Sequence, residues 1–271
     1  MLRSLVGSEM CIRDRFTTQG WEMFSKLAYV QMNYARPPFD NVKVRQAVMM
    51  AINRKFVVDN IFFGMGKIAT GPVSSTTPFY DGNVPAYPFD IKKARALVKE
   101  SGVDLAKPPV KILSYPYGSA WDRLGEYTRQ SLEQLGFKVE IESADAGTWA
   151  KRVSDFDFDL TFSYTSQYGD PALGVSRLYL TRNIVKGSAF VNNQGYRNAE
   201  MDTLWDQAAS STSAEERQKL YSTIQKQLVH DVANGYLFEM EIPTLYNGKV
   251  HNLIQSAIGL NDTFADVYID K

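Results

Sequence analysis

One loop of this sequence carries side chains suited to binding a small molecule. The eight residues Tyr164–Pro171 hold two aromatic rings, hydroxyl groups, an amide and a carboxylate. Such a loop can stack on the apolar part of a solute and form hydrogen bonds with its polar groups. The alternative is a plain polar turn that ends at the Asp-Pro pair. The candidate ligand-binding residues of this loop are Tyr164, Ser166, Gln167, Tyr168 and Asp170.

Acidic residues just before this loop alternate like the start of a calcium-binding loop. Asp155, Asp157 and Asp159 have the spacing of its first ligands, but the following Gly and the distal Glu are missing. Phe156 and Phe158 alternate with them, which favours the edge of a strand. We therefore expect no metal site here.

The sequence contains no pattern of a catalytic or phosphate-binding site. Gly64–Lys67 lacks the spacing of a phosphate-binding loop, and no Gly-x-Ser-x-Gly motif occurs. His230 and His251 have no partner pattern for metal binding or for a catalytic triad. We predict no catalytic residue and no cofactor.

A run of alternating strands and helices leads to the loop. Strands are expected at 110–115, 137–142 and 158–164, with helices at 119–135 and 147–153 between them. The short links favour a parallel sheet with right-handed crossovers. Ligands of open α/β sheets bind outside the carboxyl ends of the strands, so the loop after 158–164 lies at the binding edge.

Further elements flank this run. Asp90, Asn198 and Ser213 are each expected to cap a helix. The other expected elements are a strand at 27–33, an irregular loop at 64–88, a helix at 91–101 and a strand at 236–240. The last residues, 244–271, lack a helical period and would need another lobe to pack on.

The segment 37–54 predicts an extended entry followed by a helix. Pro37 and Pro38 favour extended neighbours, and Asp40 can cap the helix N-terminus. One apolar face is formed at helical spacing by Val44, Val48, Ala51, Ile52 and Phe56. The basic residues that fall mostly off this face are Lys43, Arg45 and Arg54. The period alone is equally typical of an ordinary amphipathic surface helix.

The residue string of this segment is more specific than its period. PPFDNVKVRQAVMMAINR at 37–54 resembles the signature of the extracellular solute-binding proteins of family 5, the dipeptide and oligopeptide receptors of ABC importers. Three further stretches resemble the same family in the same order: Gly169–Pro171, Tyr196–Asp202 and Glu216–Tyr221. Together the matches cover most of residues 27–250.

This resemblance implies a fold and a function. The fold would be α/β, a periplasmic-binding-protein-like lobe of type II with a mixed or parallel sheet, with the N-terminal lobe mostly missing. The function would be that of the substrate-binding component of an ABC importer, which captures a peptide-like or other small organic solute and delivers it to the permease. We expect a monomer that is periplasmic, or extracellular and membrane-associated. Two alternatives stay open, a hydrolase-like α/β enzyme and a receptor that acts only in sensing.

Site residues follow from the same resemblance. In peptide-binding members an Asp of this loop holds the ligand's α-amino group beside a Trp, and Gln167 and Tyr164 match those positions. Gln167 lacks the charge that favours an ammonium, so we expect a modified peptide, an amino-acid conjugate or a neutral solute. Gln167→Asp should then improve peptide affinity by about 1.5–3 kcal/mol. Trp149 matches a second aromatic residue bordering the pocket, with a core position as its alternative.

Composition limits the partners further. Lys plus Arg and Asp plus Glu each number 30, and this zero net charge argues against a nucleic-acid or anionic-membrane surface. No run of about 18 apolar residues, the length that could span a bilayer, occurs. Cys11 is the only cysteine, so no intrachain disulfide can form and cysteine usage leaves the compartment open.

The first residues are unlike the start of an exported protein. Residues 1–15 have neither the apolar core nor the cleavage site of a signal peptide, and their string resembles a translated sequencing-adapter artefact. We expect this segment to be non-native and to pack on nothing, and the export signal to be lost with a missing N-terminal portion. Residues 37–243 are expected to form the ligand-binding lobe. Residues 16–36, as a hinge strand, and 244–271 would belong to the other lobe and expose apolar side chains.

Overall fold

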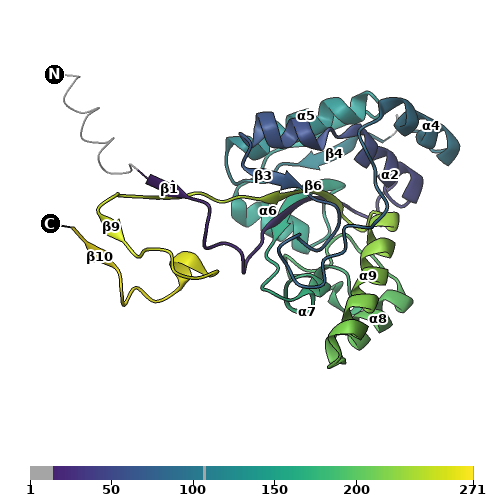
Figure 1. Ribbon diagram of the computed structural model, residues 1–271. Coiled ribbons are helices and arrows are strands. Elements are labelled where there is room, and N and C mark those ends of the chain that lie inside the picture. Colours follow the sequence, from purple (N-terminus) through teal and green to yellow (C-terminus); the bar gives the residue numbers. More distant parts are fainter. Residues whose placement is uncertain (1–14, 106–107, 271) are drawn as a thin grey trace, which may run out of the picture.

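The body of the protein is built on one six-stranded mixed sheet (Figure 1). The computed structural model describes residues 15–105 and 108–270. In spatial order the strands are β3 (Gly66–Ile68), β7 (Gly235–Met240), β2 (Leu27–Met32), β6 (Leu160–Thr165), β4 (Val110–Leu113) and β5 (Val139–Glu142). Strand β4 pairs in parallel with β5 and β6, whereas β2 is antiparallel to β6 and β7. The predicted α/β class with a mixed sheet is confirmed.

Helices cover both faces of this sheet. Figure 1 shows α2, α4 and α5 on one side and α8 and α9 on the other. The helix bounds are α2 (Val42–Ala51), α3 (Arg54–Phe56), the π-helical η1 (Val57–Ile61), α4 (Ile91–Ser101), α5 (Ser119–Glu133), α6 (Ala146–Ser154), α7 (Pro171–Gly174), α8 (Ala199–Ser210) and α9 (Ala214–Asp231), with the short 3₁₀ turns η2 (Ser176–Leu178), η3 (Thr181–Asn183) and η4 (Gly259–Asn261). A hydrophobic core lies on each face of the sheet, and strand β2 contributes to both. Its Ala28 and Val30 pack on one face, and its Leu27 and Tyr29 pack on the other.

The helix N-termini follow local side-chain chemistry. Asp90, Asn198 and Ser213 cap α4, α8 and α9 through side-chain oxygens that accept backbone N–H groups, as predicted. The prediction for α2 is wrong by one residue, because Asn41 is the cap in place of Asp40. The Oδ1 atom of Asn41 accepts the N–H of Lys43 at 2.9 Å.

Strand β2 contradicts the prediction that residues 16–36 are a hinge strand from another lobe. All six of its residues are buried, and it lies in the middle of the sheet with a hydrogen-bonded strand on each side. The chain therefore enters the body at Leu27, within the segment 16–36 that was assigned to the other lobe. Continuous burial on both faces explains the apolar run of this strand.

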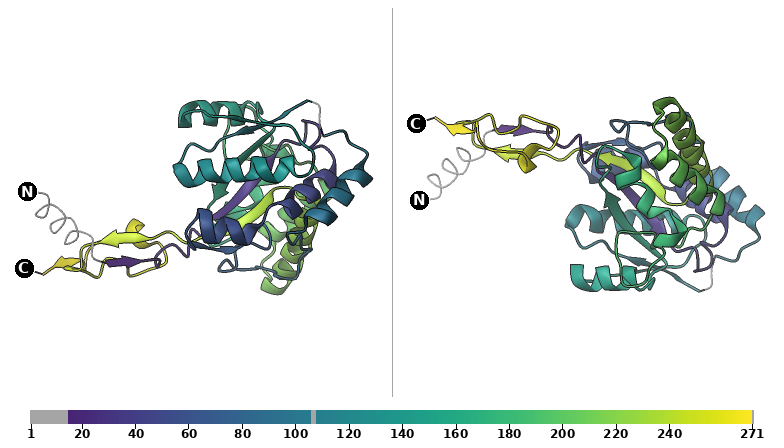
Figure 2. Two further views of the ribbon diagram at one scale, coloured as in Figure 1. Left: turned by 90° about the horizontal axis from the view of Figure 1, so that it is seen from above. Right: turned by 90° about the horizontal axis from the view of Figure 1, so that it is seen from below.

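Residues 15–26 and 241–270 form a terminal arm that projects from the body in both views of Figure 2. In it β1 (Arg15–Thr17) pairs with β8 (Thr244–Tyr246), and β9 (Val250–His251) pairs with β10 (Tyr268–Ile269). Residues 1–15 were expected to pack on nothing. Of these, residues 1–14 lie outside the described part of the chain. The expectation is wrong for Arg15, which pairs with Tyr246.

The arm leaves large apolar side chains exposed, as the sequence predicted. These are Phe16, Met23, Leu245, Leu260, Phe264, Tyr268 and Ile269. The arm alone is therefore too thin to bury its own apolar residues.

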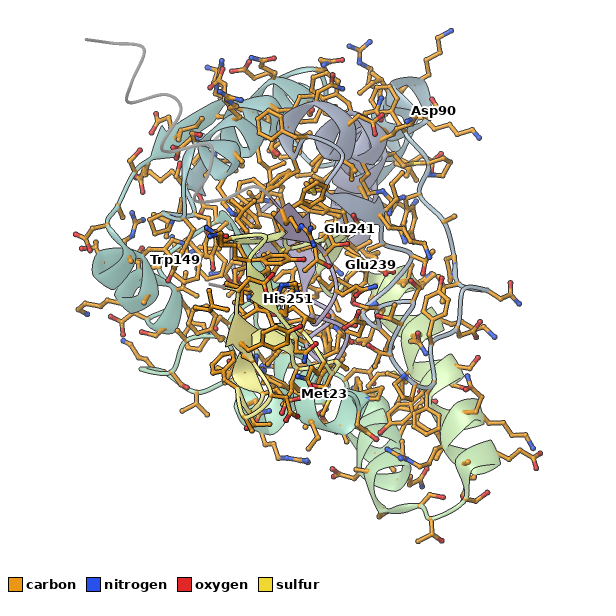
Figure 3. The ribbon with its side chains drawn as sticks, turned by 60° about the vertical axis from the view of Figure 1, so that its left-hand side comes forward. Met23, Asp90, Trp149, Glu239, Glu241 and His251 are labelled. Carbon is orange, nitrogen blue, oxygen red and sulfur yellow. The ribbon has the colours of Figure 1, made fainter. Side chains whose placement is uncertain are left out.

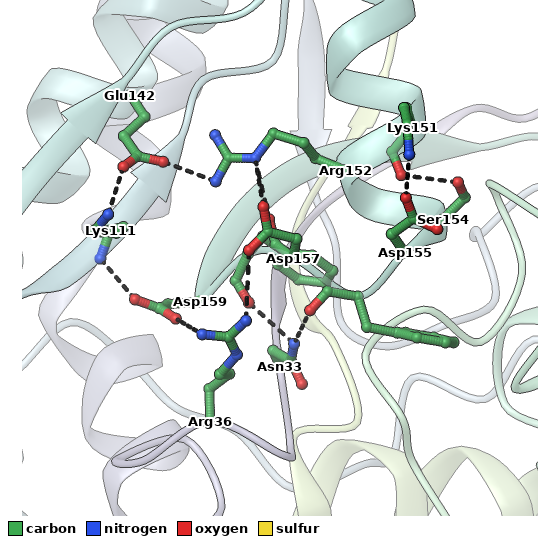
Figure 4. A network of polar contacts seen from close by, with 12 residues as sticks. Asn33, Arg36, Lys111, Glu142, Lys151, Arg152, Ser154, Asp155, Asp157 and Asp159 are labelled. Carbon is green, nitrogen blue, oxygen red and sulfur yellow. Dashed lines mark hydrogen bonds and ion pairs between the residues drawn. The ribbon is translucent and has the colours of Figure 1, made fainter. Parts of the chain in front are cut away.

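The acidic residues Asp155, Asp157 and Asp159 were predicted to lie at the edge of a strand, but they precede β6. Asp157 and Asp159 belong to an ion-pair network at the amino end of β4 (Figure 4). Asp157 and Asp159 both lie near Arg36, at 3.4 and 3.8 Å. Arg152 contacts Glu142 at 2.7 Å and Asp157 at 3.1 Å. Within residues 15–105 and 108–270, no group of three or more His, Cys, Asp or Glu residues is arranged to hold a metal.

Replacing the central cation of this network should lower stability modestly. Arg152→Gln leaves two partly exposed carboxylates without their shared partner, so we expect a loss of about 1 kcal/mol in urea denaturation. Hydrogen bonding, first by Lys111 and then by Arg152, holds the pKa of Glu142 below its ordinary value. A lowered carboxyl pKa stabilises the fold at neutral pH, and this contribution is lost as the pH falls. The difference between variant and wild type should therefore shrink below about pH 4.

A matched control for this variant is Lys219→Gln. The pair between Lys219 and Glu215 is about three-quarters exposed on both sides, so its loss should cost less than about 0.5 kcal/mol. Equal losses in the two variants would show that the network adds no more than a surface pair.

Candidate functional site

An aromatic cavity of about 440 Å³ lies where the body meets the terminal arm. Its aromatic side chains are Trp21, Phe24, Tyr115, Tyr117, Tyr164, Tyr168 and Phe190. Its polar side chains are Lys26, Ser166, Arg177 and Asn261. The wall is thus built from the body and from both segments of the arm, 15–26 and 241–270.

Sheet topology explains why these residues meet. Strands β4 and β6 are parallel, so the residues that follow them, including Tyr115 and Ser166, lie at the same edge. Strand β2 is antiparallel to β6, which brings its first residues to that edge too. Lys26 therefore lies beside the loop after β6. The cavity occupies the carboxyl ends of the parallel strands, the position that α/β sheets use for ligands.

The aromatic wall is ordered by ring contacts centred on Tyr115. This buried ring stacks on Tyr117 with centroids 4.5 Å apart and meets Tyr164 edge-on at 6.2 Å. Tyr117 itself is 51% exposed, so one of its faces remains accessible. Such a wall can stack on a planar or apolar group.

Two cations complete the wall. Lys26 Nζ lies 4.9 Å from the ring centre of Trp21 and 5.0 Å from that of Tyr164. The guanidinium of Arg177 lies 5.9 Å from the ring centre of Tyr168. Partial burial lowers the pKa of Lys26, because desolvation disfavours the charged ammonium.

Three of the predicted site residues line this cavity. Tyr164, Ser166 and Tyr168 alternate along the end of β6 and the loop that follows, and they face the same side. This is the period-two alternation of an extended chain. Tyr168 then turns the loop with a positive φ of 55°.

Gln167 does not face the cavity, so the prediction that it does is wrong. Its side chain is fully buried on the opposite side. Nε2 donates to the carbonyl of Pro72 at 3.2 Å, and Oε1 accepts the N–H of Ser74 at 3.4 Å. Its backbone N–H donates to the carbonyl of Phe24 at 2.6 Å. Gln167 therefore connects three segments behind the site, and the alternation that points its neighbours inward points it away.

Asp170 and Trp149 also lie away from the cavity wall, contrary to prediction. Asp170 caps α7 by accepting the N–H of Ala172 at 2.8 Å and pairs with Arg217 at 2.7 Å. Trp149, labelled in Figure 3 on α6, is 1% exposed, and its Nε1 donates to Thr161 at 2.9 Å. Its core alternative is thus the one observed. Trp149 lies directly behind the wall, 4.9 Å from the ring of Tyr115.

Most residues of the wall were not predicted from the sequence. The missed residues are Trp21, Phe24, Lys26, Tyr115, Tyr117, Arg177, Phe190 and Asn261. Tyr115 and Tyr117 could have been found by applying the carboxyl-end rule to β4 as well as β6. The residues of the arm carry no such signal, because their position depends on where the chain passes from the arm into the body, at Leu27.

The chain is thus an α/β lobe with an aromatic cavity at one edge of its sheet. Residues 22–186 match the family model described as bacterial extracellular solute-binding proteins, family 5 Middle. The chain belongs to this family. Because it is a family of solute-binding proteins, the hydrolase alternative finds no support. In the part of the chain that the structure describes, no helix is long and apolar enough to cross a bilayer.

Two relatives and one solved structure each match most of this chain. Heme-binding protein A of Haemophilus influenzae is 30% identical over 90% of the chain and 44% of its own length. Di/tripeptide-binding protein 1 of Pseudomonas aeruginosa is 28% identical over 90% of the chain and 45% of its own length. The crystal structure of the ABC transporter substrate-binding protein CtaP of Listeria monocytogenes superposes with a TM-score of 0.84 at 20% identity, covering 98% of this chain and 54% of CtaP. The chain thus spans about half the length of these proteins.

Proposed function

We propose that this chain forms one wall of the ligand cleft in the substrate-binding component of an ABC importer. It captures a peptide-like or other small organic solute and delivers it to the permease subunits in the membrane. The observation that carries this proposal is the aromatic cavity at the carboxyl ends of β4 and β6 in a chain of this family. The relatives named for heme and for di- and tripeptides support a solute of this size and class.

The terminal arm is the root of a second lobe in this proposal. Its exposed apolar side chains and its place at the cavity mouth support this assignment. The body, residues 27–240, is the ligand-binding lobe, with crossings at residues 18–26 and near Pro243. The two lobes close on the solute by bending at these crossings.

The mature protein acts as a monomer outside the cytoplasmic membrane, in the periplasm or attached to the membrane surface. The family's description as extracellular supports this location. A receptor that acts only in sensing would use the same lobe. Neighbouring genes for two permeases and two ATPases would favour the importer, and their absence would favour the sensor.

Solute binding can be tested by fluorine NMR on the chain labelled with fluorotryptophan. Trp21 lines the cavity, whereas Trp205 belongs to α8 and is buried in the core where α8 packs on α9. In titrations with dipeptides and N-acylated amino acids, at least one solute should shift the Trp21 resonance saturably and leave Trp205 unchanged. Tyr164→Ala should weaken that binding about fivefold, the usual scale for one aromatic contact. If no solute in the panel moved Trp21, the proposed function would be contradicted.

A further inference from the structure

The charges of the aromatic cavity are all of one sign. Lys26 and Arg177 line it, and neither Asp nor Glu does so among the described residues. Neither cation forms an ion pair within the described part of the chain, although Arg36, Lys111, Arg152 and other basic residues do. In a chain with zero net charge, two unpaired cations at one site are a local excess of positive charge.

The two cations approach the cavity from different elements. Lys26 precedes β2, and Arg177 belongs to the 3₁₀ turn η2. Lys26 lies over the ring of Tyr164 near the end of β6, and Arg177 lies over the ring of Tyr168 in the loop that follows. These two rings alternate on the same side of the loop, so the cations flank the same stretch of wall.

Arg177 has hydrogen-bonding capacity that the described residues do not use. Its Nε is buried without a hydrogen-bond partner, and its Nη2 makes only a long contact of 3.4 Å to Thr165 Oγ1. A buried donor without an acceptor costs free energy. A guanidinium offers paired N–H groups whose geometry matches a carboxylate.

From this arrangement we infer that the solute bound in the aromatic cavity carries a carboxylate beside a planar apolar group and has no free ammonium at that end. The apolar group stacks on the tyrosine wall, and the carboxylate lies between Lys26 and Arg177. The inference deepens the proposed function and rests on it. Gln167, which faces away from the cavity, has no part in this recognition.

Three probes that share one side chain separate charge from stacking. N-acetyl-L-phenylalanine carries a carboxylate, N-acetyl-L-phenylalanine amide is neutral, and L-phenylalanine amide carries an ammonium. Calorimetry and Trp21 NMR with the full chain should show the first probe binding about tenfold or more tighter than either of the others, the scale of one charged hydrogen bond. Its binding should weaken as salt is raised.

Matched variants assign this preference to the two cations. Lys26→Gln and Arg177→Gln should each reduce the preference for the carboxylate at least about fivefold, a change of about 1 kcal/mol. Lys219→Gln removes the same charge from an exposed ion pair on α9 and should leave all three affinities unchanged. Because the wild type alone ranks the three probes, the test holds even if one variant fails to fold.

The outcomes separate this inference from the proposed function. Equal affinities, or a preference for the neutral or ammonium probe, would overturn the inference, and so would binding of free dipeptides when N-acetyl-L-phenylalanine fails to bind. In each of these cases the chain still binds a solute, so the proposed function remains supported. Only a chain that binds none of the probes, dipeptides or acylated amino acids would contradict the proposed function.

Discussion

Gln167→Glu is expected to destabilise the protein by about 3 kcal/mol without altering the cavity. The change replaces an N–H donor by a carboxylate oxygen that faces the carbonyl of Pro72, at a position with no solvent exposure. A buried charge without a compensating partner costs several kcal/mol. Urea denaturation of the chain, followed by circular dichroism, measures the loss.

The pH dependence of this variant has a defined sign. Burial raises the pKa of the introduced carboxyl group above its unfolded value of about 4.3. A group with a raised folded pKa binds a proton more readily in the folded state, so stability is lost as the pH rises. The deficit of Gln167→Glu should therefore be largest at neutral pH and smallest near pH 4.

The control is Gln207→Glu, the same chemical change at an exposed position of α8. It should change stability by less than about 0.5 kcal/mol at any of these pH values. A Gln167→Glu variant as stable as this control would mean that the side chain is free to leave its buried site. The alternative prediction, that residue 167 faces the ligand, would then be restored.

Gln167→Asp is a sharper case because the family resemblance and the structure disagree on it. The resemblance predicts stronger peptide binding, whereas the buried position predicts lower stability and no new contact with a ligand. An Asp side chain is also too short to keep both bonds to Pro72 and Ser74. We therefore expect a destabilised protein whose ranking of the three phenylalanine probes is unchanged.

The disagreement over Gln167 shows how far the sequence alone could predict the site. Alternation along Tyr164, Ser166 and Tyr168 identifies one side of the loop, and the same alternation places Gln167 on the other. The resemblance assigned a role by alignment and overrode that local signal. Asp170 illustrates the same point, since the capping preference of Asp before Pro at the first helical position accounts for it.

The fold was more predictable than the site because periodic burial leaves a direct trace in the sequence. The run from β4 to β6 alternates strands and helices with short links, and the parallel pairing followed from that. Strand β2 was assigned to the wrong lobe because its position depends on antiparallel partners at residues 160–165 and 235–239. Lys26 and Arg177 are also far apart in the sequence, so no spacing motif could bring these two cations together.

The family signature at 37–54 gives the second large prediction, through Arg45. This residue fell off the apolar face of the predicted helix, yet it is only 4% exposed. Its Nη1 donates to the carbonyls of Phe39 and Asp40 at 2.8 and 3.2 Å, and its Nε and Nη2 donate to that of Asp231 at 3.1 and 2.8 Å. The guanidinium also lies 3.8 Å from the ring centre of Tyr34.

These bonds place a cation at the C-terminus of α9. Asp231 is the last residue of that helix, and Val232 follows in the left-handed region with φ 49°. The unpaired carbonyls at a helix end favour positive charge and need donors. Arg45 supplies both, and it connects α9 to the turn that precedes α2. Arg54 has a similar role, donating to the carbonyls of Ala69 and Tyr87 at 3.0 and 3.1 Å.

Arg45→Met should therefore cost about 4 kcal/mol of stability, because three backbone carbonyls lose their donors in a buried site. Arg45→Lys should cost about 2 kcal/mol, since an ammonium keeps the charge but lacks the fork that reaches all three. Lys43→Met is the control two residues away. Its ion pair with Glu100 is about half exposed, so the loss should stay below about 0.5 kcal/mol.

The result distinguishes two interpretations of the signature. If its arginines hold the fold together, Arg45→Met lowers the urea midpoint while the folded variant keeps the wild-type ranking of the three probes. If they instead act on the ligand, the ranking changes and stability does not. The geometry favours the first outcome, because Arg45 uses its bonds on backbone carbonyls and does not line the aromatic cavity. A signature of this kind identifies the lobe, and the identity of the solute depends on the cavity residues outside it.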